Sequence, residues 1–313
     1  MLKRLFIIGL GLTIVCVGVF IVLTMPRSIP AAALPDHRPD LSNGETLFWA
    51  GGCPSCHAKP DAEGDDRLQL IGGVELATPF GTFRAPNISP DPEYGIGQWT
   101  TLDFVNAMVK GVSPDGRHYY PAFPYPYYQR MPLTDLIDLK AYLNTLPALT
   151  SSIAEHDLKF PFGIRRGLGL WKLLYLDGEP FQPNANETAA IQRGRYLVQG
   201  PGHCGACHTP RDVFGGEITE RFLAGAPSLE ISQESDPDET DWIPNITPHE
   251  DGIGDWSEQD IAYALESGFD PDFDSFGGSM VEVQENMAKL PAEDRAAIAA
   301  YLKSIPALAS EEP

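Results

Sequence analysis

The chain has few cysteines, and none of them can pair into a structural disulfide. Only five of the 313 residues are cysteine. Four of these lie in two short motifs, and the fifth, Cys16, lies in an apolar N-terminal segment, so no pair is left over for a disulfide. The folded state must therefore be stabilised by burial of apolar groups and by whatever the four motif cysteines hold.

Basic side chains are also scarce. The chain has 22 Lys and Arg against 43 Asp and Glu, and from Asn184 onward it has 7 basic and 25 acidic residues. Like-charge repulsion excludes nucleic acid as a partner. The acidic surface either keeps the second half soluble or steers a basic redox partner toward it. The acids cluster at Glu234, Asp236, Asp238, Glu239 and Asp241, and again at Glu250, Asp251 and Asp255.

No constellation of catalytic acids and bases is visible in the sequence. The paired acids Asp65-Asp66 and Glu293-Asp294 are typical of solvated surface or of a helix N-terminus. The sequence therefore gives no sign of acid–base catalysis.

What the chain does contain is a repeated Cys-x-x-Cys-His motif, at Cys53–His57 and at Cys204–His208. This motif is the attachment signature for c-type haem: the thiols form thioethers to the haem vinyl groups, and the histidine ligates the iron. A zinc half-site or a redox dithiol would explain one Cys-x-x-Cys, but not two copies that each precede a histidine. We predict two covalently bound haem c groups, attached through Cys53, Cys56, Cys204 and Cys207, with His57 and His208 as proximal iron ligands.

The N-terminus resembles a membrane anchor. Residues 5–25 carry no charge and follow Lys3 and Arg4. Such a run is long enough to span a bilayer and longer than the apolar core of most signal peptides. Ala31-Ala32-Ala33 resembles a cleavage site, so a removed signal is the alternative for residues 1–30. The positive-inside rule places everything after the helix outside the cytoplasm. We expect the periplasmic side of a bacterial inner membrane, where haem of this kind is attached.

The sequence downstream of the first motif recurs after the second. Residues 86–90 match 244–248, and 95–99 match 252–256. Both copies close with Ala-Tyr-Leu, at 141–143 and at 300–302. We therefore predict an all-α fold of two tandem cytochrome c domains, residues 36–150 and 184–313, after an N-terminal transmembrane helix.

Helical spacing of apolar residues predicts helices at 102–110 and 259–266, and a closing helix before the end of each copy. Ser42 and Glu45 form a candidate capping box that would begin the first helix of copy one. The aromatic linker, residues 151–183, is expected to pack against both domains. The alternative is a short helix that covers the first domain only.

The distal iron ligands are less evident. A methionine ligand gives an iron suited to electron transfer, whereas an open position allows chemistry on a bound ligand. In the second domain Met280 lies in a loop ahead of the closing helix, while Met287 is more typical of core packing. In the first domain Phe123, which cannot ligate iron, occupies the position of Met280. Met131 is then the nearest candidate, and His118 and an open site remain alternatives.

Other matched residues have two interpretations each. Trp99 and Trp256, with Asn87 and Asn245, either support a haem propionate and the distal loop or pack beneath that loop. Arg84 and Arg211 are candidates for neutralising propionates.

At this point a resemblance to a known family is specific. Residues 202–211, 86–90, 120–125 and 160–162 resemble bacterial cytochrome c subunits of membrane-bound alcohol, gluconate and aldehyde dehydrogenases, and the match covers about residues 40–308. Those subunits often have three haem domains, so this chain resembles a shorter diheme branch. The resemblance implies a periplasmic or membrane-bound dehydrogenase as electron donor and a quinone, a soluble cytochrome or a terminal oxidase as acceptor. It also supports Met131, which ends a Tyr-x-x-Met string found in relatives with the same phenylalanine.

The leading interpretation is an electron-transfer protein that is not itself an enzyme. The alternative is a diheme redox enzyme of the peroxidase type, with an open distal site on the first haem. A thiosulfate dehydrogenase that uses a cysteine ligand is disfavoured, because outside the haem motifs the only cysteine lies in the membrane segment.

Overall fold

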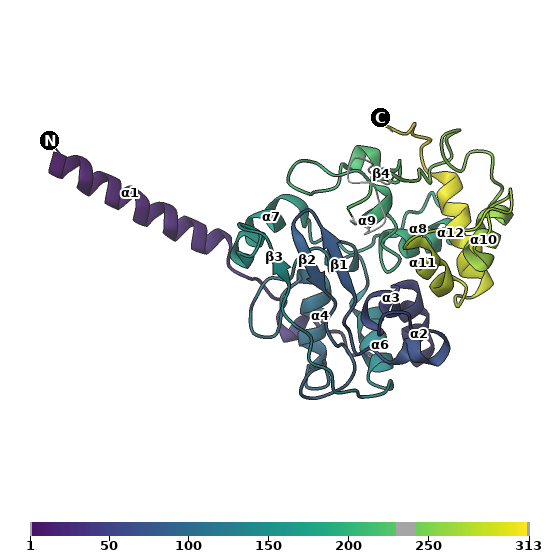
Figure 1. Cartoon of the computed structure of the whole chain (residues 1–313), viewed down its shortest axis with the longest axis horizontal. Coiled ribbons are helices and arrows are strands. Elements are labelled where there is room, and N and C mark those ends of the chain that lie inside the picture. The colour runs from purple at the N-terminus through teal and green to yellow at the C-terminus, as the bar shows by residue number, and fades with distance from the viewer. Residues whose placement is uncertain (1, 230–241, 312–313) are drawn as a thin grey trace.

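The structure is a computed structural model that describes residues 2–229 and 242–311. One long helix, α1 (Leu2–Leu23), extends away from a body formed by the other described residues (Figure 1). Within its 22 residues an 18-residue window has a mean hydropathy of 2.9, and the helix lies exposed along its length. At about 1.5 Å per residue it is long enough to cross a hydrocarbon core of about 30 Å. The predicted acidic cluster at 234–241 lies outside the described residues.

The two copies of the repeat fold in the same order. The first half contains α2 (Leu41–Ala50), α3 (Cys53–His57), α4 (Thr101–Lys110), α5 (Tyr125–Tyr128) and α6 (Leu133–Leu143). The second half contains α8 (Ala189–Gln199), α9 (Gly205–His208), α10 (Glu258–Ser267), α11 (Met280–Met287) and α12 (Ala292–Ser304). Single turns of 3-10 helix lie at Ala31–Ala33, Gly64–Leu68, Arg165–Gly167 and Thr219–Arg221.

In each half the first helix crosses the closing helix at a glycine. A Cβ atom on Gly44 of α2 would lie 2.4 Å from the Asp138 carbonyl oxygen of α6. A Cβ atom on Gly194 of α8 would lie 1.9 Å from the Ala297 carbonyl oxygen of α12. Only a residue without a side chain permits backbones to approach this closely. Each half therefore contains the same kind of helix crossing, with a glycine at the point of closest approach.

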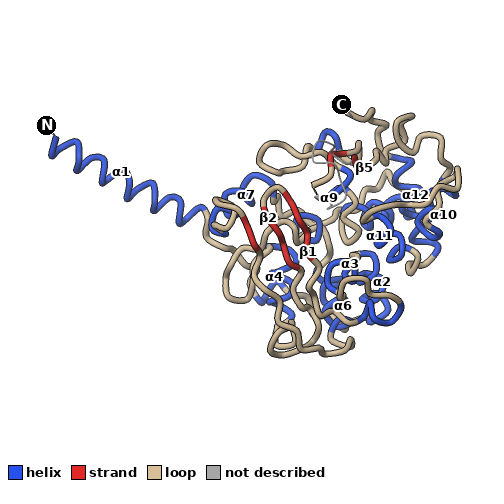
Figure 2. Tube along the Cα trace, in the orientation of Figure 1, coloured by secondary structure: helices blue, strands red, loops and turns tan. Residues whose placement is uncertain are grey.

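Short strands depart from an all-α fold (Figure 2). β1 (Glu75–Thr78) and β2 (Gly81–Arg84) form an antiparallel hairpin, and β3 (Asp157–Leu158) pairs with β2. In the second half β4 (Ala226–Pro227) pairs with β5 (Trp242–Ile243). Strands of two to four residues are too short to show the alternation of apolar and polar residues by which a strand is predicted from sequence. In addition, β3 lies in the linker, far along the chain from its partner β2. The prediction of an all-α fold is thus confirmed only in part, because the structure is mostly helical with these short strands.

The predicted helices at 102–110 and 259–266 are confirmed to within a residue. Each begins with a capping box, Thr100 with Asp103 for α4 and Ser257 with Asp260 for α10. The prediction that Ser42 caps α2 is wrong. The carboxylate of Asp40 accepts the backbone N–H groups of Ser42 and Asn43 instead, at 2.9 and 3.2 Å. An aspartate two residues earlier thus already satisfies the free donors of the first turn.

The linker contacts both halves, as expected. Its helix α7 (Leu168–Tyr175) directs the Lys172 ammonium to the carbonyl oxygens of Lys110 and Gly111, at 2.6 and 2.7 Å, at the end of α4. On the other side the Trp171 indole N–H donates to the Phe214 carbonyl oxygen at 3.1 Å. The alternative of a helix that covers only the first half is therefore wrong.

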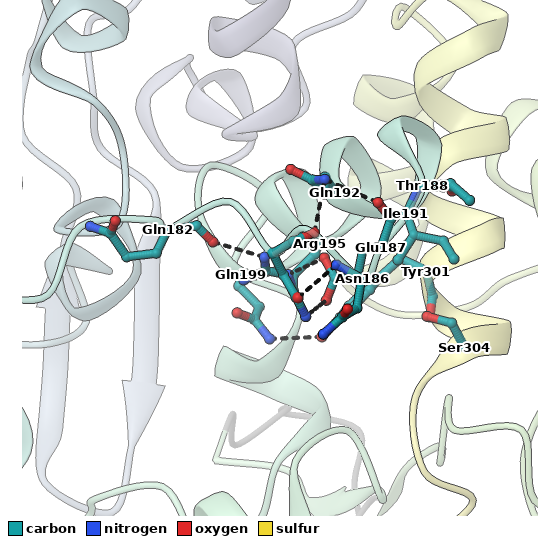
Figure 3. A network of polar contacts seen from close by, with 11 residues as sticks. Gln182, Asn186, Glu187, Thr188, Ile191, Gln192, Arg195, Gln199, Tyr301 and Ser304 are labelled. Carbon is teal, nitrogen blue, oxygen red and sulfur yellow. Dashed lines mark hydrogen bonds and ion pairs between the residues drawn. The ribbon is translucent and has the colours of Figure 1, made fainter.

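A polar network fixes the end of the linker to the second half (Figure 3). The Arg195 guanidinium of α8 donates to the Glu187 carboxylate and to the Gln182 carbonyl oxygen, both at 2.9 Å. Farther along α8, the Gln199 amide donates to the Tyr301 hydroxyl of α12 at 2.7 Å. These bonds hold the chain that enters α8 against the crossing of α8 and α12.

Candidate haem-binding sites

The first Cys-x-x-Cys-His motif forms the single helical turn α3. Gly52 precedes it with φ = 57°, a left-handed conformation that glycine adopts without strain. The His57 ring donates its Nδ1–H to the Pro86 carbonyl oxygen at 2.8 Å. Burial lowers the pKa of His57, and the bond to Pro86 only partly opposes this. The ring is therefore neutral, and its remaining nitrogen, Nε2, carries a lone pair that can ligate iron.

The second motif repeats this geometry. Its turn α9 presents His208, whose Nδ1–H donates to the Pro244 carbonyl oxygen at 2.7 Å. Burial again lowers the pKa of His208. Pro86 and Pro244 occupy matched places in the repeat, so one loop orients the histidine in each half.

The first cysteine of each motif is held as a neutral thiol. Burial raises the pKa of both Cys53 and Cys204 to about 12. Dithiol redox chemistry proceeds through a thiolate, which this burial disfavours. Among residues 2–229 and 242–311, no three His, Cys, Asp or Glu side chains are grouped so that they could bind a metal ion. The donor set fits covalent attachment to haem, with one histidine nitrogen for its iron.

Matched asparagines hold the loops that orient the histidines. The Asn87 amide donates to the Leu149 carbonyl oxygen at 2.7 Å and accepts the Ser89 N–H at 2.8 Å. Asn245 makes the equivalent bonds to Leu308 and Thr247, at 2.7 and 2.8 Å. Both asparagines thus connect the loop to the chain after the closing helix and support the loop itself.

The two matched tryptophans have similar surroundings in both halves, whereas the two matched arginines do not. Trp99 and Trp256 are partly buried against the apolar core, which favours their packing role. Arg84 pairs with Glu75 at 2.6 Å, whereas Arg211 donates to the Ala206 carbonyl oxygen of the second haem-binding turn at 2.8 Å.

The methionine candidates differ in burial. Met131 is 1% exposed in the core of the first half, directly before α6. Met280 is the first residue of α11 and is partly exposed, whereas Met287 on the same helix is 4% exposed. Met108 lies in the core, as its place in α4 predicts. In the second half burial separates the partly exposed Met280 from the buried Met287, whereas in the first half Met131 and Met108 are both buried and burial does not separate them.

His118, the alternative distal ligand of the first half, and Phe123, which occupies the position of Met280, both contact neighbouring residues. The buried His118 ring donates its Nε2–H to the Thr24 carbonyl oxygen at 2.9 Å, at the end of α1. Phe123 packs edge-to-face on Tyr119 and Tyr128, both with ring centroids 5.6 Å apart. His118 is therefore engaged in holding α1, which disfavours it as an iron ligand.

The loops before the distal elements correspond residue by residue. The Tyr119 N–H donates to Gly111 at 2.7 Å in the first half, and the Phe276 N–H donates to Gly268 at 2.9 Å in the second. Four residues beyond these bonds lie Phe123 and Met280.

A second pair of positions precedes the closing helices. Met131 precedes Pro132, the N-cap of α6, and Leu290 precedes Pro291, the N-cap of α12. Each half therefore holds one methionine in these two positions, but not in the same one.

The two haem-binding turns lie against each other through His203. This residue precedes Cys204, and its Nε2–H donates to the Gly51 carbonyl oxygen, just before Cys53, at 3.4 Å. Its ring also meets Tyr128 edge-on, with centroids 5.9 Å apart. The structure therefore places His203 between the two halves, a position that no local sequence pattern indicates.

Helix α11 of the second half also packs on the first haem-binding turn. The Asn286 amide donates to the Ser55 hydroxyl at 2.7 Å and accepts from the Arg67 guanidinium at 2.8 Å. Arg67 forms an ion pair with Glu285 as well. Sequence reasoning missed Arg67 and Asn286, because no local pattern joins residues so far apart in the chain.

Comparisons with known proteins show which sequences this chain resembles. Residues 41–147 match the cytochrome c family. The chain is 47% identical, over 98% of its own length and the whole of the relative, to a protein of Cereibacter sphaeroides named "Diheme cytochrome c-type". It is 36% identical to the fructose dehydrogenase cytochrome subunit of Gluconobacter japonicus and 35% identical to the gluconate 2-dehydrogenase cytochrome c subunit of Pantoea cypripedii. These matches cover 90% and 88% of the chain but only 55% and 62% of those two subunits.

Proposed function

Because this chain belongs to the c-type cytochrome family that includes these diheme and dehydrogenase-associated proteins, we propose that it relays electrons through two haems. In this proposal residues 36–150 and 184–313 are tandem cytochrome c domains. The observation that carries the proposal is the contact between the two haem-binding turns, with the His203 ring 3.4 Å from the Gly51 carbonyl oxygen. Two redox centres whose attachment turns touch are placed for electron exchange within one molecule.

The residues of each turn have distinct roles in this proposal. Haem c, when bound, supplies one-electron redox chemistry at an iron whose axial ligands tune its potential. Cys53 with Cys56, and Cys204 with Cys207, hold the two groups covalently. His57 and His208 present Nε2 as proximal ligands, because their Nδ1–H groups are donated to proline carbonyl oxygens. These fixed bonds keep each ring in one orientation, so little rearrangement accompanies electron transfer.

We assign Met131 and Met280 as distal ligands. The assignment is supported by the alternation of the two positions: Phe123 or Leu290 fills the position that lacks methionine in each half. Met108 lies inside α4 and Met287 ends α11, so neither occupies one of these two matched positions. Two methionine-ligated irons suit electron transfer rather than chemistry on a bound substrate.

Helix α1 is proposed to anchor the protein in a bacterial inner membrane. Its length and hydropathy suffice to span a bilayer, and Lys3 with Arg4 orient its N-terminus toward the cytoplasm. The haem-binding body then lies on the periplasmic side.

The names of the relatives support a dehydrogenase as electron donor. A quinone, a soluble cytochrome or a terminal oxidase would be the acceptor. The described acidic residues of the second half, such as Glu250, Asp251 and Asp255, would favour a basic partner surface.

The test is a reduced-minus-oxidised spectrum with haem-to-protein stoichiometry, followed by exposure to carbon monoxide. A relay predicts two low-spin haems per chain, both with methionine–iron charge-transfer bands and both indifferent to carbon monoxide. A haem that binds carbon monoxide readily would contradict the relay, because it would reveal an open distal site beside Phe123. The peroxidase-type enzyme would then be the better interpretation.

A further inference from the structure

The end of α1 is fixed to the body rather than joined by a free tether. The Arg166 guanidinium donates to the Ile21 carbonyl oxygen and to the Thr24 hydroxyl, both at 2.8 Å. His118 donates to the Thr24 carbonyl oxygen, and Thr24 itself is fully buried. The last carbonyl groups of a helix lack partners within the helix, so these bonds complete its C-terminus.

This attachment brings the linker helix α7 to the end of α1 (Figure 1). A Cβ atom on Gly169 of α7 would lie 2.5 Å from the Thr24 Cα atom. If α1 crosses the bilayer, as proposed above, its end at Leu23 lies where the hydrocarbon core meets the headgroups. Helix α7 must then lie at the same depth.

The linker exposes an apolar surface at this point. Helix α7 turns Lys172 and Gly169 inward and leaves Leu170, Leu173 and Leu174 exposed, at helical spacing on one face. The chain just before it exposes Phe160, Phe162 and Ile164. Leu174 is 69% exposed and Phe160 is 88% exposed, which is unfavourable for side chains of this size in water. We call these six residues the linker face.

The segment that carries the linker face is positively charged, whereas the chain as a whole is strongly negative. Residues 159–176 contain four basic residues and no acidic one, within a protein of net charge −21. Lys159 is exposed, and Arg165 and Arg166 are partly exposed beside the apolar side chains. Apolar and aromatic residues interleaved with basic ones are typical of segments that lie in the interface of an anionic membrane.

We propose that the linker face lies in the headgroup region of the same bilayer that α1 crosses. The inference rests on the proposed anchoring by α1 and goes beyond it. The protein would have two membrane contacts, one that spans and one that lies on the surface. The body would then be held at a fixed height and orientation, and a redox partner would meet the haem-binding turns from a defined side.

The experiment uses the full haem-loaded chain in vesicles of phosphatidylethanolamine and phosphatidylglycerol. In a Cys16→Ser background, a fluorophore is attached at Leu174→Cys and, as the matched control, at Tyr263→Cys. Tyr263 is exposed on α10, at the far end of the body from α7 (Figure 1). Fluorescence is compared between vesicles with and without a nitroxide-labelled lipid. Constant quenching by the protein's own haems cancels in this ratio.

We expect lipid nitroxide to quench the label at Leu174→Cys by about twofold or more and to leave Tyr263→Cys unchanged, since interfacial side chains lie within the acyl boundary. Vesicle flotation and intact mass report separately on the anchor. A chain that floats intact but shows no quenching at Leu174→Cys overturns only the linker-face proposal. A chain that does not float overturns both proposals. Protection of the unlabelled Leu174→Cys thiol from a water-soluble maleimide in native membranes, without quenching of the labelled protein in vesicles, would assign the face to a protein partner instead.

Discussion

In the first half the distal loop holds Phe123 where the second half holds Met280, and the position before the closing helix holds Met131 where the second half holds Leu290. The surrounding backbone is nearly the same in both: matched capping boxes, matched loop hydrogen bonds and a histidine oriented by a proline carbonyl oxygen. The orientation of each proximal histidine depends on a backbone carbonyl oxygen, of Pro86 or of Pro244, and cannot change unless the loop that carries this proline moves. The distal positions exchange side chains of similar volume, which cores tolerate well.

The largest expected effect is the loss of one covalent haem when the cysteines of one attachment site are replaced. Replacing Cys53 and Cys56 by alanine, or Cys204 and Cys207 by alanine, should lower covalent haem from about two to about one per chain in either variant, because each pair holds its own group. Pyridine haemochrome absorbance against protein mass measures this ratio. Cys16→Ser is the control and should keep both haems. Loss of both haems in one variant would mean that the two sites do not form independently.

The next effect tests whether the two distal positions are interchangeable. Combining Phe123→Met with Met131→Leu gives the first half the arrangement of the second. We expect a methionine-ligated iron to persist, with its potential shifted, because both positions face the same side of the iron in our assignment. Near-infrared magnetic circular dichroism and a redox titration report the ligand and the shift. Loss of the methionine band in the double variant would show that the loop at 123 cannot reach the iron.

A smaller effect concerns the contact between halves. Asn286→Ala leaves the guanidinium of Arg67 and the hydroxyl of Ser55 without their amide partner, which should cost about 1–3 kcal/mol. For a chain of this size each kcal/mol lowers the melting temperature by about 2–4 °C. Calorimetry with Lys59→Ala as the control is suitable, because the Lys59–Asp66 pair is exposed and should contribute at most about 1 kcal/mol. Equal destabilisation by both variants would contradict the importance of this contact.

The smallest effect is a pH dependence of the loop at residues 111–119, which the matching loop at 268–276 lacks. His118 and Ser275 occupy matched bridge positions, but only the histidine titrates. Burial lowers the pKa of His118, and the charges of Lys172 and Arg166 lower it further. The unfolded chain therefore takes up this proton at a higher pH than the folded chain does, and stability falls as the pH drops below about 6.5.

Hydrogen exchange at pH 7 and pH 5, corrected for intrinsic rates, measures this effect. Amides of residues 111–119 should lose protection at pH 5, whereas those of 268–276 should change less. His118→Gln should abolish the difference between the two segments. An equal loss of protection in both segments would assign the pH dependence to other groups.

The sequence predicts what short, contiguous patterns encode. The helices around 102–110 and 259–266 and the long apolar N-terminal helix were predicted from runs of neighbouring residues. The Ser42 cap failed because Asp40 competes for the same N–H groups. The contacts of His203 with Gly51 and of Arg67 with Asn286 join residues separated by 152 and 219 positions, and no periodicity encodes such pairs. The arrangement of the two sites relative to each other therefore required the structure.

The central claim is that each haem has its own methionine, taken from a different position in the repeat. Near-infrared magnetic circular dichroism of Met131→Leu, Met280→Leu and the double variant tests it most directly. Each single variant should lose about half of the methionine–iron intensity and the double variant should lose all of it, because one thioether ligates each iron. An unchanged spectrum in Met131→Leu would contradict the account, since the first haem would then have another distal ligand or none.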